Sequence, residues 1–138
     1  MRCNQSGLAK SDACYLAGII DGEGCIRMNN SPRLQVTSTD PRLMNWLHTR
    51  LRGYVWSEDR KPPCKPIYVW ELSARAALAV IRDVRPFLVM KRDQADIVIR
   101  YYSEGFVPRP RNARQMAANV AKRESAKAQL KVLNRKGA

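Results

Sequence analysis

The sequence contains few of the residues that bind zinc. It has a single histidine, His48, and four cysteines that form no Cys-x-x-Cys pair. Structural zinc sites are built from closely spaced cysteine and histidine side chains, so we expect no zinc-binding domain. Free thiols fit a reducing compartment. The cysteines are Cys3, Cys14, Cys25 and Cys64.

Long apolar segments are also missing. The longest apolar run, Ala13 to Ile20, is far shorter than a membrane-spanning helix, and residues 1–12 lack the apolar core of a signal peptide. We therefore expect no membrane association and a soluble, intracellular protein, in the bacterial cytoplasm or in an organelle. The 138 residues are about the size of one ordinary domain, so residues 1–138 are predicted to form a single domain.

Acidic residues are scarce relative to basic ones. The chain has 12 Asp and Glu against 25 Lys and Arg, a formal net charge of +13 and a pI near 10.2. Such a charge favours a polyanionic partner, nucleic acid before membrane. From Arg109 onward, nine Lys and Arg stand against one acid, Glu124. For the last ten or so residues of this basic segment, 109–138, the alternative is a solvated, partly disordered tail, and residues 111–134 are predicted to form a final helix with a weak apolar stripe at Met116, Val120, Leu130 and Leu133.

The spacing of apolar residues predicts helix, hairpin, helix, hairpin and further helices. An α+β fold follows, with an αββαββα core, a four-stranded antiparallel saddle-shaped sheet, helices on one face and additional C-terminal helices. The predicted elements are a helix from Ser11 or Asp12 to Gly22, strands 25–29 and 33–37, a helix capped by Asp40, strands 54–60 and 67–72, a short helix capped by Ser73, and an amphipathic helix with Gln94, Ile97, Val98 and Tyr101 on one stripe.

One acidic side chain stands where the first helix should end. Residues Leu16 to Gly24 read Leu-Ala-Gly-Ile-Ile-Asp-Gly-Glu-Gly, and Glu23 follows the apolar part of that helix. The C-terminal end of a helix carries partial negative charge, so a carboxylate there is unfavourable unless a cation compensates it. A metal ion is the cation that we expect.

These nine residues resemble the motif of the LAGLIDADG homing endonucleases, and depart from it at Ile19, Gly22 and Glu23. A second segment, Pro86-Phe87-Leu88-Val89-Met90-Lys91, is similar to a conserved segment of that family that ends in a lysine. The order of elements over residues 12–105 also matches the family's core. The chain is therefore identified as a member of the single-motif, homodimeric subfamily.

The resemblance implies a site-specific double-stranded DNA endonuclease that hydrolyses phosphodiester bonds in a long pseudo-palindromic site and leaves short 3′ overhangs. By resemblance, Glu23 binds Mg²⁺, with Mn²⁺ as a possible substitute, and the Gly22 carbonyl is a further ligand. Lys91 would stabilise charge on the phosphate or orient water, although an ordinary lysine at a helix start is the alternative. Ser38 and Arg42 match a polar and a basic catalytic position of the family, and Arg42 is otherwise a phosphate clamp or a solvated residue.

Small residues line one side of the first helix. Cys14, Gly18 and Gly22 lie four residues apart, which allows another backbone to approach closely. Since only one copy of the motif is present, the resemblance implies a homodimer in which the second helix comes from a second chain. Packing inside the monomer is the alternative. The predicted interface residues are Cys14, Leu16, Ala17, Gly18, Asp21 and Gly22, with Asp21 in a structural or capping role.

Polar residues alternate with apolar ones on the predicted hairpins. A two-stranded ribbon fits the DNA major groove, although ordinary solvent-facing polarity gives the same pattern. A one-residue register shift in the second hairpin would exchange Trp56 and Glu58 for Val55 and Ser57. The basic C-terminal segment is expected to contact phosphates. The predicted DNA contacts are Arg27, Asn29, Arg33, Gln35, Thr37, Trp56, Glu58, Arg60 and Glu71.

Two other classes of function remain open at this point. A cleavage-inactive nucleic-acid-binding protein of the same fold, either an intron RNA maturase or a transcription regulator, would not need Glu23 and Lys91. A general basic architectural protein would leave the nine-residue motif unexplained. The sequence contains no evident protein-splicing domain, so we expect an intron-encoded, free-standing enzyme of a mobile element, with no small-molecule cofactor beyond the metal.

Overall fold

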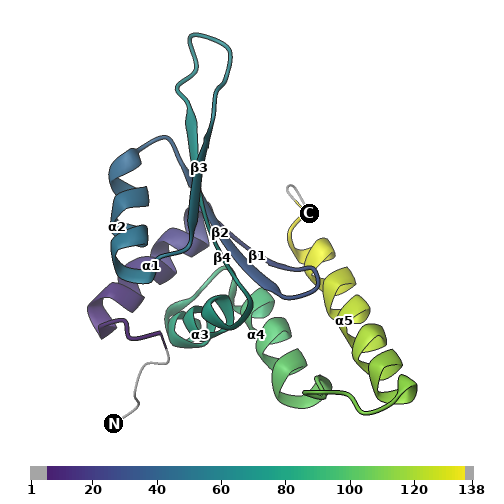
Figure 1. Ribbon diagram of the computed structural model, residues 1–138. Coiled ribbons are helices and arrows are strands. Elements are labelled where there is room, and N and C mark those ends of the chain that lie inside the picture. Colours follow the sequence, from purple (N-terminus) through teal and green to yellow (C-terminus); the bar gives the residue numbers. More distant parts are fainter. Residues whose placement is uncertain (1–5, 136–138) are drawn as a thin grey trace.

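The structure is a computed structural model that describes residues 6–135, and its fold is α+β as predicted. A four-stranded antiparallel sheet carries helices along one face (Figure 1). Cys3 and the last three residues of the basic segment lie outside the described residues. The elements are α1 (Lys10–Glu23), β1 (Gly24–Met28), β2 (Pro32–Ser38), α2 (Pro41–Leu51), β3 (Tyr54–Glu58), β4 (Ile67–Ser73), α3 (Ala74–Val84), η1 (Arg85–Phe87), α4 (Arg92–Arg100), η2 (Tyr101–Gly105) and α5 (Ala113–Leu133).

The two hairpins meet in the middle of the sheet. The strand order is β1-β2-β4-β3, so β2 and β4 are central and β1 is an edge strand. Ile26 lies opposite Leu34, and Leu34 lies opposite Leu72, so these apolar side chains share one face. All three are buried. Both predicted hairpins are present, and the first confirms the prediction from period-two alternation, because side chains of a strand point to opposite faces in turn.

The core lies between this face of the sheet and the helices. Leu16, Ala17 and Ile20 of α1 are fully buried and belong to the same apolar cluster as residues of β2, β4 and α3. Full burial of a large apolar side chain contributes about 1.5–3 kcal/mol relative to exposure. The cluster therefore fixes α1 against the sheet and determines where the C-terminal end of α1 lies.

Trp70 is a fully buried side chain that explains the glycine at the start of β3. Its indole N–H donates to the carbonyl of Arg52 at 2.6 Å. Gly53 has a φ of +93°, and a Cβ there would lie 2.8 Å from Trp70 Nε1 and 2.7 Å from the carbonyl oxygen of Glu71. Glycine is required by both the backbone conformation and the close approach.

The helix starts differ in how well they follow local signals. At α2 the cap prediction is confirmed, since the Asp40 carboxylate accepts from the backbone N–H of Arg42 and Pro41 begins the helix. At α1 the cap prediction is wrong. The helix begins at Lys10 with Ala9 as N-cap, and Asp12 instead forms an ion pair with Arg50 at 3.3 Å. Ser73 precedes α3 as expected but makes no capping hydrogen bond.

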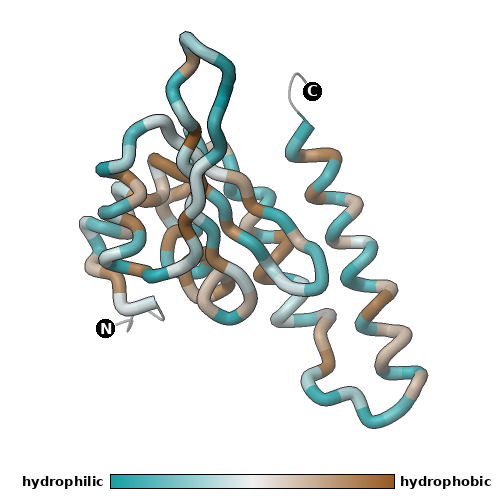
Figure 2. The backbone as a smooth tube through the Cα atoms, turned by 45° about the horizontal axis from the view of Figure 1, so that its top comes forward, coloured by the Kyte–Doolittle hydropathy of each residue, from teal (hydrophilic) through white to brown (hydrophobic). Residues whose placement is uncertain are grey.

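The basic C-terminal segment forms α5, a 21-residue helix beside β1 and α4 (Figure 1). The predicted apolar stripe is wrong at Met116, Val120 and Leu133, whose side chains are 56%, 44% and 41% exposed. The buried residues of α5 are Asn119, Ala126 and Leu130. A buried asparagine and an alanine carry little hydrophobic signal, which is why the pattern indicated the wrong face. The turns of α5 carry many hydrophilic residues, as does the tip of the β3–β4 hairpin (Figure 2).

Three asparagine hydrogen bonds hold α5 in place. The Asn119 amide accepts from the backbone N–H of Val107 and donates to the carbonyl of Val107, both at 2.8 Å. At the other end of the helix, the Asn134 amide donates to the carbonyl of Ile26 at 2.9 Å. Ile26 belongs to the edge strand, so α5 covers part of an edge that would otherwise offer unpaired backbone groups.

Candidate nucleic-acid interface and metal site

The C-terminal end of α1 presents an exposed carboxylate. Glu23 is the last residue of the helix, and within residues 6–135 its side chain makes no hydrogen bond or ion pair. A carboxylate at this end of a helix adds to the negative pole of the helix dipole. Nothing in the described part of the chain offsets this cost at the Glu23 carboxylate itself, so the unfavourable placement predicted from the sequence is confirmed.

Asp21, two residues earlier, is fully engaged inside the chain. Its carboxylate accepts from the backbone N–H of Val89 at 2.9 Å, of Met90 at 3.1 Å and of Lys91 at 3.0 Å. These residues lie in the irregular segment between η1 and α4, where no helix or strand satisfies their N–H groups. In the structural role expected for Asp21, its carboxylate accepts hydrogen bonds from three consecutive backbone amides.

Lys91 lies at the same end of α1. Its ammonium donates to the carbonyl oxygen of Asp21 at 3.1 Å. A cation is favourable there because the last carbonyls of a helix have no intrahelical donor. The structure thus brings Lys91, from a segment 68 residues away, to within two residues of Glu23 along α1.

Ser38 ends β2, which runs past the same end of α1, and Arg42 follows in α2. Gly24 pairs with Val36, so Ser38 at the end of β2 extends beyond the junction of α1 and β1. The Ser38 hydroxyl accepts from the backbone N–H of Asp40 at 3.0 Å. The exposed Arg42 guanidinium donates to both carboxylate oxygens of Asp40, and this hydrogen bonding lowers the pKa of Asp40 to about 2. Arg42 is therefore neutralised locally in the free chain.

The residues at this end of α1 fit a magnesium site that is completed from outside the chain. Residues 6–135 contain no cluster of three or more His, Cys, Asp or Glu side chains suited to hold a metal. The oxygen donors present are the free Glu23 carboxylate and the carbonyls of the last helical turn, including that of Gly22. Mg²⁺ needs only one or two carboxylates when waters and substrate phosphates supply the remaining ligands.

The predicted line of small residues lies on the outward side of α1, whereas two of the residues predicted to contact a second chain do not. Cys14, Gly18 and Gly22 are exposed. A Cβ added to Gly18 or Gly22 would meet no atom within 4 Å beyond its own stretch of helix. Leu16 and Ala17 are instead 0% exposed and belong to the core of the monomer, so their side chains are not free to contact another chain.

The polar face of the first hairpin concentrates positive charge. Arg27 of β1 lies directly opposite Arg33 of β2, and like charges in such cross-strand pairs are destabilising. The Arg27 guanidinium donates to the side-chain oxygen of Gln35 at 3.1 Å. Arg33 pairs weakly with Glu71 at 3.5 Å, and its buried Nε has no hydrogen-bond partner in residues 6–135. Thr37 is half-buried on the same face, and Asn29 is exposed beyond the end of β1.

The register of the second hairpin is the one assumed when Trp56 and Glu58 were predicted to contact DNA. Trp56 pairs with Val69 and Glu58 with Ile67, while Tyr54 pairs with Glu71. Glu71 also pairs with Gln35, so these residues continue the polar face of the first hairpin. Val55 lies opposite the buried Trp70, on the other face. Arg60 falls in the loop after β3, where its guanidinium donates to the carbonyl of Lys65 at 2.8 Å.

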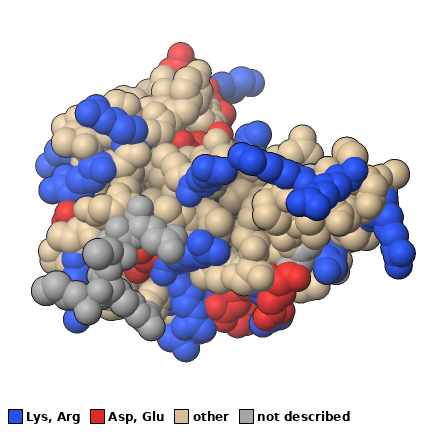
Figure 3. Space-filling model, turned by 60° about the horizontal axis from the view of Figure 1, so that its bottom comes forward, with Lys and Arg blue, Asp and Glu red and all other residues tan. Residues whose placement is uncertain are grey.

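Basic side chains occur over much of the surface. In the view of Figure 3, Lys and Arg side chains are spread over the visible surface, while acidic side chains gather in a few small areas. No helix within residues 6–135 is long and apolar enough to cross a membrane.

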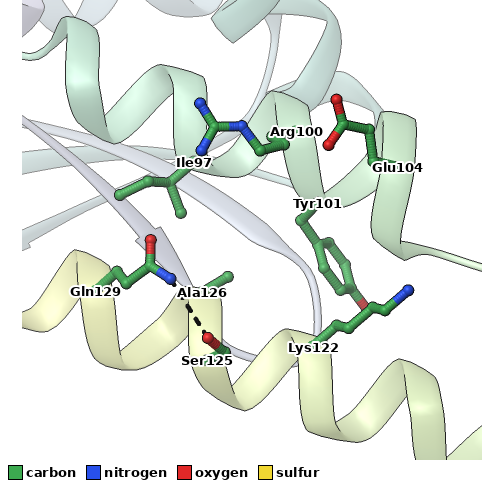
Figure 4. Close-up of a pocket in the computed structure, with 8 residues that line it drawn as sticks. All are labelled: Ile97, Arg100, Tyr101, Glu104, Lys122, Ser125, Ala126 and Gln129. Atoms are coloured by element: carbon green, nitrogen blue, oxygen red, sulfur yellow. Dashed lines mark hydrogen bonds between the residues drawn. The ribbon is translucent and has the colours of Figure 1, made fainter.

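A pocket of about 280 Å³ opens between α4 and α5, with Arg100, Tyr101 and Lys122 in its wall (Figure 4). None of the predicted site residues lines this pocket.

Solved homing endonucleases share this arrangement of helices and strands. I-CvuI in complex with a DNA target has a TM-score of 0.68 at 17% identity, over 94% of this chain and 86% of that chain. The archaeal intron-encoded homing endonuclease I-Vdi141I complexed with DNA has a TM-score of 0.69 at 16% identity, over 93% and 87%. The chain has the LAGLIDADG homing endonuclease fold.

A longer LAGLIDADG protein matches this chain over only part of its length. The LAGLIDADG meganuclease I-AabMI, bound to uncleaved DNA, has a TM-score of 0.54 at 17% identity, over 90% of this chain and 43% of that chain. This chain thus corresponds to somewhat less than half of the longer one. No protein-family model matches the chain, and no curated protein matches its sequence.

Two features of the site were not predicted from the sequence. The three-amide contact of Asp21 joins residues that are 68 to 70 positions apart and involves backbone groups, which leave no side-chain pattern. The asparagine anchors of α5 were also missed. Asn119 occurs at helical spacing from Ala126 and Leu130, but polarity alone gives no sign that a side chain is buried.

Proposed function

We propose that this chain is a site-specific double-stranded DNA endonuclease that acts as a homodimer and depends on Mg²⁺ or Mn²⁺. The observation that carries the proposal is the end of α1, where an unpartnered Glu23 carboxylate lies two residues from the carbonyl that binds the Lys91 ammonium. A structural role does not explain Glu23, because a helix C-terminus gains nothing from an exposed carboxylate. Encoding within an intron or another mobile element is part of the proposal.

Dimerisation is supported by two glycines that the monomer does not require. Glycine inside a helix costs about 0.5–1 kcal/mol relative to alanine. The space around Gly18 and Gly22 would accept a methyl group in one chain, so a second backbone packed against α1 is the reason we propose for their presence. The match to less than half of a longer chain that is bound to DNA agrees with a second copy taking the place of the other half.

DNA binding is supported by the polar face of the sheet and by the charge of α5. The opposed Arg27 and Arg33 would be stabilised by an anionic partner, and arginine is suited to guanine edges and to phosphates. Lys127 and Lys131 lie four residues apart in one exposed row of α5, which the exposed Arg135 follows after the end of the helix. We assign base contacts to the sheet and sequence-independent phosphate contacts to this row.

Hydrolysis would be divided among the residues at the end of α1. Glu23 and the Gly22 carbonyl would hold a divalent ion, which would supply activation of water and stabilisation of the leaving oxygen. The Lys91 ammonium interacts with the scissile phosphate and its developing charge. Ser38 orders solvent near the phosphate. Arg42 exchanges Asp40 for a phosphate oxygen when DNA binds, which an arginine in a fully exposed ion pair does at little cost.

A cleavage assay tests this function. The substrate is a DNA duplex made by joining the two sequences that flank the coding element, with a library of randomised duplexes as a second substrate, each with and without Mg²⁺. The expected result is staggered double-strand cleavage with short 3′ overhangs that Glu23→Gln abolishes while DNA binding persists. Glu124→Gln, on an exposed position of α5, is the matched control and should cleave like the wild type.

Binding without cleavage would overturn the enzymatic part of the proposal. If the wild type binds one DNA or RNA site but never cuts with Mg²⁺ or Mn²⁺, an intron RNA maturase or a transcription regulator becomes the better assignment. If it binds all duplexes equally, a basic architectural protein is indicated, because non-specific affinity comes from phosphate contacts alone.

A further inference from the structure

Two helix ends hold each other through Asp21 and Lys91. Asp21, in the last turn of α1, places its carboxylate on the amides that lead into α4. Lys91, the N-cap residue of α4, returns its ammonium to the Asp21 carbonyl at 3.1 Å. Each contact suits the helix end that it meets, since an anion is favourable at a helix N-terminus and a cation at a C-terminus. We call this pair of contacts the α1–α4 clasp.

The clasp is the point at which the segment before α4 is attached to α1. Leu88 is 0% exposed and anchors the segment in the core, whereas the side chains of Val89 and Met90 are 76% and 72% exposed. Within the described residues, the carboxylate of Asp21 is the group that the N–H groups of Val89, Met90 and Lys91 bind. No capping side chain at Lys91 takes over this task.

We propose that Asp21 is a positioning residue for DNA cleavage: by accepting hydrogen bonds from the three amides of residues 89–91 it fixes the Lys91 ammonium at the end of α1. This inference rests on the proposed nuclease function. The ammonium reaches the end of α1 only if the backbone of residue 91 is held there, because the lysine side chain has four rotatable carbons and no preferred direction of its own. The position of the residue 91 backbone therefore determines where the Lys91 ammonium lies.

The carboxylate form is required for this role. Three amide donors converge on two oxygens, Oδ2 accepting one hydrogen bond and Oδ1 accepting two. An asparagine has nearly the same shape, but it offers one acceptor oxygen and directs an NH₂ group at the remaining amides. Asp21→Asn therefore loses at least one of the three hydrogen bonds without creating a cavity, and weakens the attachment of the residue 89–91 backbone to α1.

The test is a double-mutant cycle on cleavage in the full chain. Asp21→Asn should lower kcat about 100-fold, the low end for loss of one positioned electrostatic donor, while KM and DNA affinity without divalent metal stay within about twofold. In the Asp21→Asn/Lys91→Met double variant, kcat should equal that of Lys91→Met within about twofold, because Asp21 acts through Lys91. Asp93→Asn, an exposed acid in the first turn of α4, is the charge-matched control.

Amide hydrogen exchange of residues 89–91 provides a second readout that needs no cleavage. Exchange should be slow in the wild type and in Asp93→Asn, and faster in Asp21→Asn. If the wild type cleaves and Asp21→Asn keeps its kcat, or if the effects of Asp21→Asn and Lys91→Met multiply in full, the positioning role is wrong and the proposed function stands. If the wild type cleaves no DNA, both fail together.

Discussion

Gly18→Ala is expected to stabilise the monomer and weaken its association. Gly18 lies in the middle of α1, and a Cβ there meets no atom within 4 Å beyond its own stretch of helix. Alanine is favoured over glycine inside a helix by about 1 kcal/mol. With nothing in the chain to oppose it, the full gain should appear in the free energy of unfolding of the monomer, as a rise of about 4 °C in Tm.

The dimer should respond in the opposite direction. If two copies of α1 approach each other at Gly18, each alanine adds a methyl group where the two backbones are closest. Overpacking of this kind costs about 1–3 kcal/mol per site, so two sites weaken association by at least about 2 kcal/mol. The dissociation constant of the dimer then rises about 30-fold or more.

Analytical ultracentrifugation over a range of protein concentrations measures the association, and thermal unfolding below the dissociation constant measures the monomer. Asn45→Ala is the matched control, because Asn45 is exposed in the middle of α2 and gains helix propensity without lying on α1. It should raise Tm and leave association unchanged. A Gly18→Ala variant that associates as tightly as the wild type, or a wild type that stays monomeric at all concentrations, would refute the reasoning.

Three further outcomes follow from contacts elsewhere in the chain. Hydrogen bonds from Arg85 lower the pKa of Asp96, so the stability that this pair contributes is present above the unfolded pKa of about 3.9 and is lost as the pH falls through the lower folded value. In urea unfolding, Asp96→Asn should therefore lower the midpoint at pH 7, and the difference from the wild type should shrink below pH 4. Asn119→Ala leaves the N–H and carbonyl of Val107 without their amide partner and should cost about 2 kcal/mol, seen as a lower Tm, whereas Ser125→Ala on the exposed side of α5 should not. Mixed dimers of wild-type chain and Glu23→Gln should nick one strand; complete loss of cutting in the mixed dimer would mean that both carboxylates serve each strand.

Sequence patterns predicted those parts of the fold in which neighbours along the chain carry the information. The β1–β2 hairpin follows from the alternation of Ile26 and Met28 with polar residues, and the start of α2 follows from Asp40 and Pro41. In both cases the decisive contacts join residues only a few positions apart. The order of elements could therefore be predicted, and with it the α+β class.

The prediction failed where a tertiary contact overrode the local pattern. In α5 the exposed Met116 and Val120 gave an apolar stripe, while the buried face is held by the hydrogen bonds of Asn119 and by the small Ala126, which permits close packing. At α1, the pairing of Asp12 with Arg50 draws a potential capping residue into the helix. A polar side chain is buried only if a distant partner satisfies it, and that partner is not visible in the local sequence.

For the site, the sequence indicated candidate residues, and the structure separates them by whether the chain itself needs them. Asp21 and Glu23 are both acids near the end of α1, yet the first satisfies three amides and the second has no partner in residues 6–135. Gly24 is required internally, because a Cβ would lie 2.7 Å from the Cα of Ile20, whereas Gly18 is not. Residues that cost stability and satisfy nothing within their own chain indicate partners outside it. On α1, we therefore assign Glu23 to a cation and Gly18 to a second helix.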